Sequence, residues 1–302
     1  MSAPPVRVAR AFAPGHVTGV FRPDASHRDP RARGSVGAGV VLELGVWAEA
    51  RFSPGLRSRV RVVADSARPL PISEEVARRI APGASGALTV RLMHELPIGQ
   101  GFGMSAAGAL ATALAVGSLA GRTRSKAVEV AHLADLFGGG GLGGVAAILG
   151  GGLEVRTRPG IPPFGHVAHR TFPPALLVGV VGRPISSPTV LKSPAALRRI
   201  TEASHSWERL GPSPSVQGFF RMSERFTDRA GLASAAVSRT VSALRRRGAR
   251  ACQAMFGQSF FALPSNSKAR ASCLDWLESE GIRAVELRAS ATGAYVARSL
   301  PV

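Results

Sequence analysis

A glycine-rich loop runs directly into an apolar helix between residues 97 and 117, PIGQGFGMSAAGALATALAVG. Gly99, Gly101 and Gly103 stand at alternate positions, and such residues let a backbone adopt unusual conformations and touch a ligand. From Ser105 onward the alanine and leucine content predicts a buried helix, whose first N–H groups attract anions. The segment therefore predicts an anion site, and a triphosphate would suit it.

The loop differs from the two common phosphate signatures. The sequence has no G-x-x-x-x-G-K-[ST] segment, and the glycines of the loop do not have the G-x-G-x-x-G spacing. A Walker-type ATPase and a Rossmann dehydrogenase are both disfavoured. By itself the loop is also compatible with tight packing beside a core helix.

Apolar periodicity predicts a mainly β first part, followed by alternating helices and strands. Strands are expected over 6–12, ended by APG at 13–15, over 34–52 as two strands turning near Gly45, and over 60–63, 87–93, 175–181, 258–263, 283–287 and 294–298. Helices are expected over 73–80, 105–120, 125–137 (with a serine cap at its start), 195–210, 216–228, 232–247 and 267–280. The mixture is typical of an α+β fold.

Three segments resemble the motifs of the GHMP kinases, the family of galactokinase, homoserine kinase and mevalonate kinase. P-x-G-x-G-F-x-x-S-A-A at 97–107 resembles the nucleotide-binding motif, APGHVTGVF at 13–21 the first motif, and AMFGQSFFAL at 254–263 the third. Within the family, His16 after APG, GSVGAG at 34–39 and FPPALLVGVVGRPISSPTVL at 172–191 are similar to the archaeal pantoate kinases.

The resemblance implies a two-domain GHMP kinase fold with the active site between the domains. Residues 1–158 would form a nucleotide-binding domain like ribosomal protein S5 domain 2, and residues 159–302 an α/β sandwich. The implied reaction transfers the ATP γ-phosphoryl group to the terminal hydroxyl of pantoate, giving 4-phosphopantoate for coenzyme A biosynthesis, with Mg²⁺ as cofactor. The resemblance is also compatible with a homodimer.

The same resemblance assigns site residues. ATP would lie on Pro97, Gly99, Gln100, Gly101, Phe102, Gly103, Met104, Ser105, Ala106 and Ala107. Ser105 and Asp135 would hold Mg²⁺ and act in catalysis, although Ser105 could simply cap the helix. The acceptor would contact His16, Thr18, Arg22, Ser35, Gly257, Gln258 and Ser259. A structural histidine at 16 and a turn glycine at 257 are the plainer alternatives.

One position departs from the family pattern. Where the pantoate kinases typically read T-G-L-G-D-V, this chain reads GGLGGV at 140–145, so the expected catalytic aspartate is Gly144 and the usual threonine is Gly140. Phosphoryl transfer depends mainly on positioning and charge neutralisation, so a kinase can work without a strong base. Alternatively the chain is slow, recruits another group, or is a catalytically impaired nucleotide- or RNA-binding protein. Mevalonate and homoserine remain alternative acceptors.

Charge and composition limit the classes of molecule that this protein is expected to bind. The net charge of +19 favours anions, but the densest basic run is only Arg245–Arg247, and three tryptophans and one tyrosine leave little surface for base stacking, so nucleic acid is disfavoured. Cys252 and Cys273 form neither a zinc spacing nor a disulfide framework. No secretory signal is expected, and the apolar run 105–120 is too short for a membrane span, which predicts a cytoplasmic protein.

Overall fold

The computed structural model describes residues 5–65, 69–184, 187–205 and 207–297. Its strands are β1 (Arg7–Asp24), β2 (Gly34–Pro54), β3 (Arg59–Ala64), β4 (Gly86–His94), β5 (Leu153–Arg158), β6 (His166–Arg170), β7 (Leu176–Val180), β8 (Ala249–Gln253), β9 (Ser259–Pro264), β10 (Ala284–Leu287) and β11 (Tyr295–Ala297). Its helices are α1 (Pro71–Ile80), α2 (Met104–Leu119), α3 (Arg124–Phe137), α4 (Gly144–Ala147), α5 (Ser187–Leu191), α6 (Pro194–Ala203), α7 (Val216–Ala230), α8 (Ala235–Arg246) and α9 (Ser267–Ser279), with 3-10 turns at Pro30–Ala32 and Trp207–Leu210.

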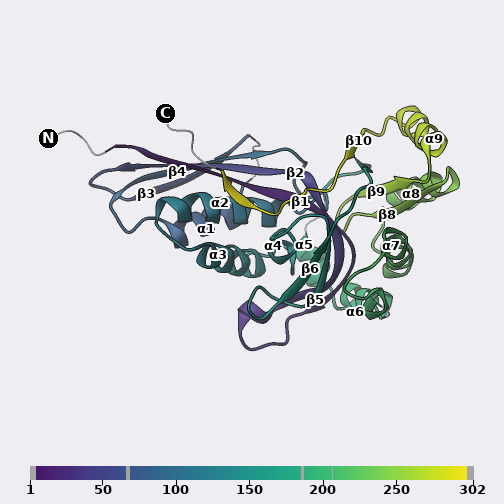
Figure 1. Cartoon of the computed structure of the whole chain (residues 1–302), viewed down its shortest axis with the longest axis horizontal. Coiled ribbons are helices and arrows are strands. Elements are labelled where there is room, and N and C mark those ends of the chain that lie inside the picture. Colours follow the sequence, from purple (N-terminus) through teal and green to yellow (C-terminus); the bar gives the residue numbers. More distant parts are fainter. Residues whose placement is uncertain (1–4, 66–68, 185–186, 206, 298–302) are drawn as a thin grey trace.

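Two sheets confirm the predicted α+β class. In the described chain the larger sheet has the order β11-β1-β2-β4-β3, with β5 paired to β2 and β6 to β5. Its pairings are antiparallel except for β3 and β4, which are parallel. Helices α1, α2 and α3 lie along one face of this sheet, while the smaller sheet, of order β10-β7-β9-β8, lies at the other end of the molecule (Figure 1).

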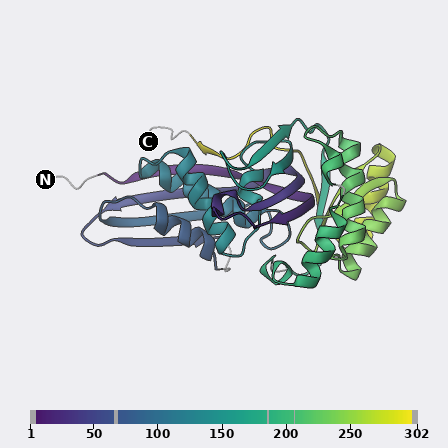
Figure 2. The ribbon, with the colours of Figure 1, turned by 90° about the horizontal axis from the view of Figure 1, so that it is seen from below.

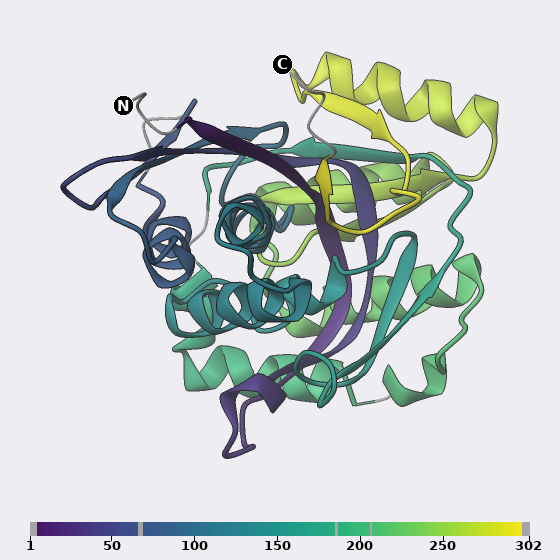
Figure 3. The same ribbon diagram turned by 60° about the vertical axis from the view of Figure 1, so that its left-hand side comes forward.

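The first two strands are longer than their sequence suggests. APG at 13–15 does not end β1 and Gly45 is not a turn, so both predictions were wrong. Pro14 pairs with Gly45, and the register of β1 against β2 shifts between Pro14 and His16. A Cβ at position 45 would lie 2.2 Å from the Ala13 carbonyl oxygen, so this glycine permits close approach of two strands that bend together (Figure 3).

Helix α2 forms the centre of the main core. Most of its residues are buried, including its alanines, which favour the helix and let the sheet and α3 approach closely. It begins after Gly103, whose φ of 71° is left-handed. Helix α3 is capped by Thr123, whose Oγ1 accepts from the Lys126 N–H at 3.2 Å, rather than by the predicted serine.

The C-terminal half packs helices on the smaller sheet, with α6 to α9 gathered at that end (Figure 2). Leu177, Val237 and Phe260 belong to a separate apolar cluster there. The chain then returns, because β11 pairs with β1 through Tyr295 opposite Phe12. The predicted domain boundary at 158/159 falls between β5 and β6, two strands of the larger sheet that pair with each other, and it stays a prediction.

Two arginines of the basic run 245–247 form contacts within the protein. Arg245 forms an ion pair with Asp228 at 2.8 Å and donates to the Ala251 carbonyl oxygen, while the Arg247 guanidinium lies over the Trp276 ring. Within the described residues, the model has no helix with both the length and the hydropathy that a membrane crossing requires.

Candidate active site

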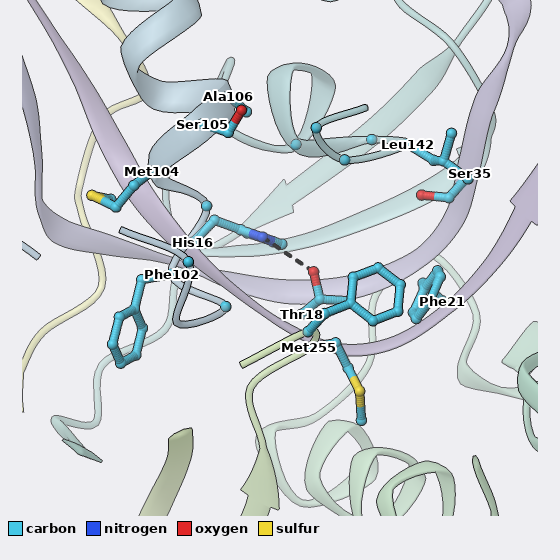
Figure 4. A pocket seen from close by; sticks show the side chains of 18 of the residues that line it. His16, Thr18, Phe21, Ser35, Phe102, Met104, Ser105, Ala106, Leu142 and Met255 are labelled. Carbon is cyan, nitrogen blue, oxygen red and sulfur yellow. Dashed lines mark hydrogen bonds between the residues drawn. The ribbon is translucent and has the colours of Figure 1, made fainter. Parts of the chain in front are cut away.

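A cavity of about 130 Å³ lies where the glycine loop, β1 and the start of α2 meet (Figure 4). Segments far apart in sequence line it: His16, Thr18, Phe21, Ser35, Gly99, Gly101, Phe102, Gly103, Met104, Ser105, Ala106, Gly140, Gly141, Leu142, Gly143, Gly144, Arg156, Met255 and Phe256. The three motif segments near positions 16, 101 and 255 therefore share one cavity. Ser105 and Ala106 form one wall, with Leu142 and Ser35 to one side and Met255 and Phe21 opposite.

The glycine loop is left-handed at all three glycines. Gly99, Gly101 and Gly103 have φ values of 78°, 76° and 71°, a region that residues with a Cβ seldom adopt. A Cβ on Gly101 would lie 2.5 Å from the carbonyl oxygen of Ala254, so the loop is pressed against the third motif. The first motif also contacts the loop, since the His16 N–H donates to the Phe102 carbonyl oxygen at 2.9 Å.

Gln100 ties the loop to the C-terminal half. Its Nε2 donates to the Gly182 carbonyl oxygen at 2.8 Å, and its Oε1 accepts from the Gln258 N–H at 3.2 Å. The Ser259 hydroxyl donates to the Gln100 carbonyl oxygen, and a Cβ on Gly257 would collide with that same oxygen. These contacts place residues 257–259 behind the loop, where they support its shape.

The buried Asp135 and the exposed Ser105 form a hydrogen-bonded pair at the edge of the cavity. The Ser105 hydroxyl donates to Asp135 Oδ1 at 3.0 Å, and the Gly141 N–H donates to Oδ2 at 3.1 Å. Burial raises the pKa of Asp135 to about 6, although both hydrogen bonds favour the ionised form. The carboxylate belongs to α3, and the hydroxyl to the first turn of α2.

Gly140 makes room for that carboxylate. A Cβ at position 140 would lie 1.8 Å from Asp135 Oδ1 and 3.0 Å from the Ser105 hydroxyl. The position of the Asp135 carboxylate and the missing side chain at 140 therefore depend on each other: the carboxylate oxygen lies where a threonine side chain would begin.

Gly144 lines the cavity beside Ala106. A Cβ at 144 would lie 2.6 Å from the Ala106 Cβ, which is held by the backbone of α2. Gly144→Asp is therefore expected to lower the free energy of unfolding by about 1–3 kcal/mol through overpacking. Adding Ala106→Gly should recover part of that loss, even though glycine in a helix costs about 1 kcal/mol by itself.

Urea unfolding of the two single variants and the double variant measures this coupling. The loss in Gly144→Asp/Ala106→Gly is expected to be smaller than the sum of the single losses. Additive losses would contradict the contact between positions 106 and 144.

Three polar side chains, two of them charged, lie in contact with one another at the cavity. His16 Nε2 lies 2.8 Å from Glu154 Oε1, and the Arg156 guanidinium forms an ion pair with the same oxygen. All three residues are buried. Sequence reasoning missed Glu154 and Arg156; their signal was two charges at i and i+2 in a strand, which places both side chains on one face.

Arg156 has unused donor capacity facing the cavity. Its Nε is buried and lacks a hydrogen-bond partner among the described residues. A Cβ at position 143 would lie 2.5 Å from the Ser35 hydroxyl and 3.1 Å from Arg156 Nε, so glycine at this position lets the backbone pass close to both groups. A guanidinium and a hydroxyl placed in this way suit a carboxylate ligand.

Some of the predicted site residues line the cavity and others do not. On the cavity wall lie His16, Thr18, Ser35, Gly99, Gly101, Phe102, Gly103, Met104, Ser105, Ala106 and Gly144. Gln100, Gly257, Gln258 and Ser259 support the loop, Asp135 lies behind Gly140, Ala107 is buried in α2, and Pro97 is exposed. Arg22 forms an ion pair with Glu208 at 2.8 Å, so its predicted substrate contact has a competing partner.

Comparisons with known proteins agree with this geometry. Residues 71–152 match the family model described as the GHMP kinases N terminal domain. The chain is 35% identical over 230 residues to a pantoate kinase of Thermococcus kodakarensis, covering 74% of this chain and 76% of that protein. It is 31% identical over 262 residues to a pantoate kinase of Methanospirillum hungatei, covering 84% and 86%.

Solved structures show the same fold over nearly the full length. A protein described as a phosphotransferase related to the CoA biosynthesis pathway aligns with a TM-score of 0.87 and 29% identity, covering 98% of this chain and 100% of that one. Mevalonate diphosphate decarboxylase from Staphylococcus aureus aligns with a TM-score of 0.69 at 14% identity, and this similarity supports the fold alone.

Proposed function

Because this chain belongs to the GHMP kinases, in the branch formed by the pantoate kinases, we propose that it transfers the γ-phosphoryl group of ATP to the terminal hydroxyl of pantoate. The product is 4-phosphopantoate, an intermediate of coenzyme A biosynthesis. The observation that carries the proposal is a single cavity lined by both the glycine loop and Arg156, which brings an anion cradle and a carboxylate partner together.

The nucleotide side of the cavity is the loop and the first turn of α2. Three left-handed glycines expose main-chain N–H groups, and the N-terminus of α2 adds a partial positive charge. The first N–H groups of a helix lack partners within it, so they are available to phosphate oxygens. Ser105 stands at this end of α2 and adds a hydroxyl group.

Ser105 and Asp135 fit a magnesium ion. Among the described residues no cluster of three or more histidine, cysteine or acidic side chains is placed to hold a metal. Mg²⁺ needs no such cluster, because it usually keeps several waters and binds one or two carboxylates together with substrate phosphates. The bare Gly140 leaves Asp135 Oδ1 behind the wall with no side chain in front of it. When bound, the ion neutralises charge on the phosphate oxygens.

The acceptor side is the Arg156 and Ser35 wall. We assign the carboxylate of pantoate to the Arg156 guanidinium and the Ser35 hydroxyl, because both residues line the cavity beside Gly143. Glu154 forms an ion pair with the guanidinium and so holds it in place. A carboxylate anchored there leaves the far end of the acceptor, with its hydroxyl, free to lie toward the phosphate loop, as an in-line transfer requires.

The test is a phosphorylation assay with ATP and Mg²⁺, in which pantoate, mevalonate and homoserine are offered in parallel and the product is identified by phosphorus NMR. Turnover is expected with pantoate, and EDTA should abolish it. Pantoamide keeps the hydroxyls but lacks the carboxylate charge, so its KM is expected to be about tenfold higher or more. A higher kcat/KM for mevalonate or homoserine would overturn the assignment, as would absence of turnover and of ATP binding.

A further inference from the structure

The cavity that we propose for the acceptor hydroxyl has no carboxylate at position 144. Among the described residues that line it, His16 is the side chain able to take up a proton near neutral pH, because Arg156 is permanently charged and the remaining polar lining groups are hydroxyls. Thr18 lies two residues along β1 and also lines the cavity. Together these observations direct attention to the contacts of His16.

His16 lies in a chain of polar contacts. Its Nε2 is 2.8 Å from Glu154 Oε1, and its Nδ1 is 3.3 Å from the Thr18 hydroxyl oxygen, which Figure 4 shows as a dashed line. The imidazole fits because position 39 is glycine: a Cβ there would lie 2.3 Å from His16 Nε2. The ring is therefore held between β2 and β5, with its Nδ1 side turned to Thr18.

The direction of these hydrogen bonds follows from the charge of Glu154. Burial favours its neutral form, but Arg156 and His16 outweigh burial and hold the pKa of Glu154 below its usual value. An ionised carboxylate only accepts, so His16 Nε2 donates to it. Nδ1 then carries a lone pair, which accepts from the Thr18 hydroxyl. Burial, the largest effect, lowers the pKa of His16, so the ring is neutral at pH 7.

We propose that the Glu154–His16–Thr18 chain accepts the proton of the acceptor hydroxyl, replacing the carboxylate that position 144 lacks. The inference rests on the proposed function. As the acceptor oxygen bonds to the γ-phosphorus, its proton passes to the Thr18 oxygen while the Thr18 proton passes to His16 Nδ1. The bond between the γ-phosphorus and the bridging oxygen breaks, and its electron pair stays on ADP. Glu154 stabilises the imidazolium, which returns its proton to solvent after product release.

Other charged groups also face His16. Glu154 favours the imidazolium, whereas Arg156 on β5 and His169 on β6 oppose it. The carboxylate is in contact with the ring, so it can hold the charge during the reaction, while the opposing groups favour release of the proton afterwards. Asp135 lies behind Gly140, where it accepts from the Ser105 hydroxyl, and it takes no part in these contacts.

Substitutions at His16 and Thr18 test the proposed Glu154–His16–Thr18 proton path. His16→Gln preserves volume and can still donate to Glu154, but cannot take up a proton; its kcat is expected to fall by about 10²- to 10⁴-fold with ATP affinity unchanged. Thr18→Val should lower kcat in the same direction, and Thr18→Ser should retain it. His166→Gln is the matched control, because His166 Nδ1 contacts the Thr157 hydroxyl at 2.7 Å in an exposed pair outside the cavity.

The pH dependence separates proton transfer from positioning. Below the pKa of His16, log kcat of the wild type should fall with a slope of about one as the imidazole takes up a proton, and His16→Gln should lack this fall. An unchanged slope, or a kcat within about threefold of the wild type, would overturn the inference. So would loss of ATP binding together with kcat.

A second readout needs no substrate. Nitrogen-15 NMR of the histidine rings at pH 7.5 is expected to show His16 protonated at Nε2 and bare at Nδ1; protonation at Nδ1 would overturn the inference. A wild type that phosphorylates no pantoate would instead contradict the proposed function, which the activity assay reports independently of the tautomer.

Discussion

Asp135→Asn is expected to abolish most of the activity and at the same time to stabilise the protein. Loss of the carboxylate beside Ser105 removes the charge that would hold Mg²⁺, so kcat should fall by about 10²-fold or more. The asparagine can turn so that its oxygen accepts from the Gly141 N–H while its amide donates to the Ser105 hydroxyl, which keeps both observed contacts satisfied. The fold therefore loses a buried charge and no hydrogen bond.

The gain in stability depends on pH in a defined direction. Burial raises the pKa of Asp135 from 3.8 to about 6, so the folded state holds the proton more tightly than the unfolded state. The contribution of Asp135 to the free energy of unfolding is fully present below pH 3.8 and is lost as the pH rises through about 6. Once the carboxyl group is ionised, the free energy of unfolding is lower by about 3 kcal/mol. Asp135→Asn should thus be more stable than the wild type at pH 8 by up to about 3 kcal/mol, and similar to it near pH 4.

Urea unfolding between pH 4 and 8, in EDTA and without nucleotide, measures this difference. Asp275→Asn, an exposed aspartate on α9, is the matched control and should show little change at any pH. A stability difference between Asp135→Asn and the wild type that does not vary with pH would contradict the raised pKa.

Gly101→Ala is expected to damage both the nucleotide site and the contact between the halves of the molecule. Its φ of 76° is strained for alanine by about 1–2 kcal/mol. The new Cβ would also lie 2.5 Å from the Ala254 carbonyl oxygen and 2.8 Å from the Gly257 N–H nitrogen, both backbone atoms that cannot rotate away. If displacement of the loop costs a further 3 kcal/mol or so, ATP affinity falls by about 10²-fold.

Gly121→Ala provides the matched control at the other end of α2. Its φ of 64° imposes the same left-handed strain, but no described atom lies within 4 Å of the added Cβ. We expect a modest loss of stability there and unchanged ATP affinity, measured by urea unfolding and isothermal titration calorimetry. Equal losses of ATP affinity in the two variants would show that the contact with residues 254–257 is unimportant.

Local signals predicted the longer helices and most strands, but they missed the short helices α4 and α5 and misjudged β1 and β2. Proline and glycine at 14, 15 and 45 are chain breakers when only neighbouring residues are considered. In the structure, Pro14 and Gly45 lie opposite each other in a register shift, so the two breakers produce one bend in a continuous ladder. Which residues face each other across a sheet depends on pairing, and a sequence pattern does not specify it.

The candidate site also contains residues that the sequence could predict and residues that it could not. His16, Thr18 and Ser105 could be predicted because they belong to short contiguous motifs, and the structure places all three on the cavity wall. Glu154 and Arg156 could not, since a charged pair in a strand is usually exposed, and their partner His16 lies 138 residues away from Glu154. Gly140 appeared to be a lost side chain until the position of the Asp135 carboxylate accounted for it.

The sequence by itself determined the glycine loop, because its glycines and the helix that follows are contiguous and their backbone conformation is local. Only the tertiary structure decided how the acceptor side is built. Pairing of β2 with both β1 and β5 brings His16, Glu154 and Arg156 together under the cavity, and Gly39 leaves space for the imidazole ring. These contacts arise from long-range strand pairing in three dimensions, which no short segment of the chain encodes alone.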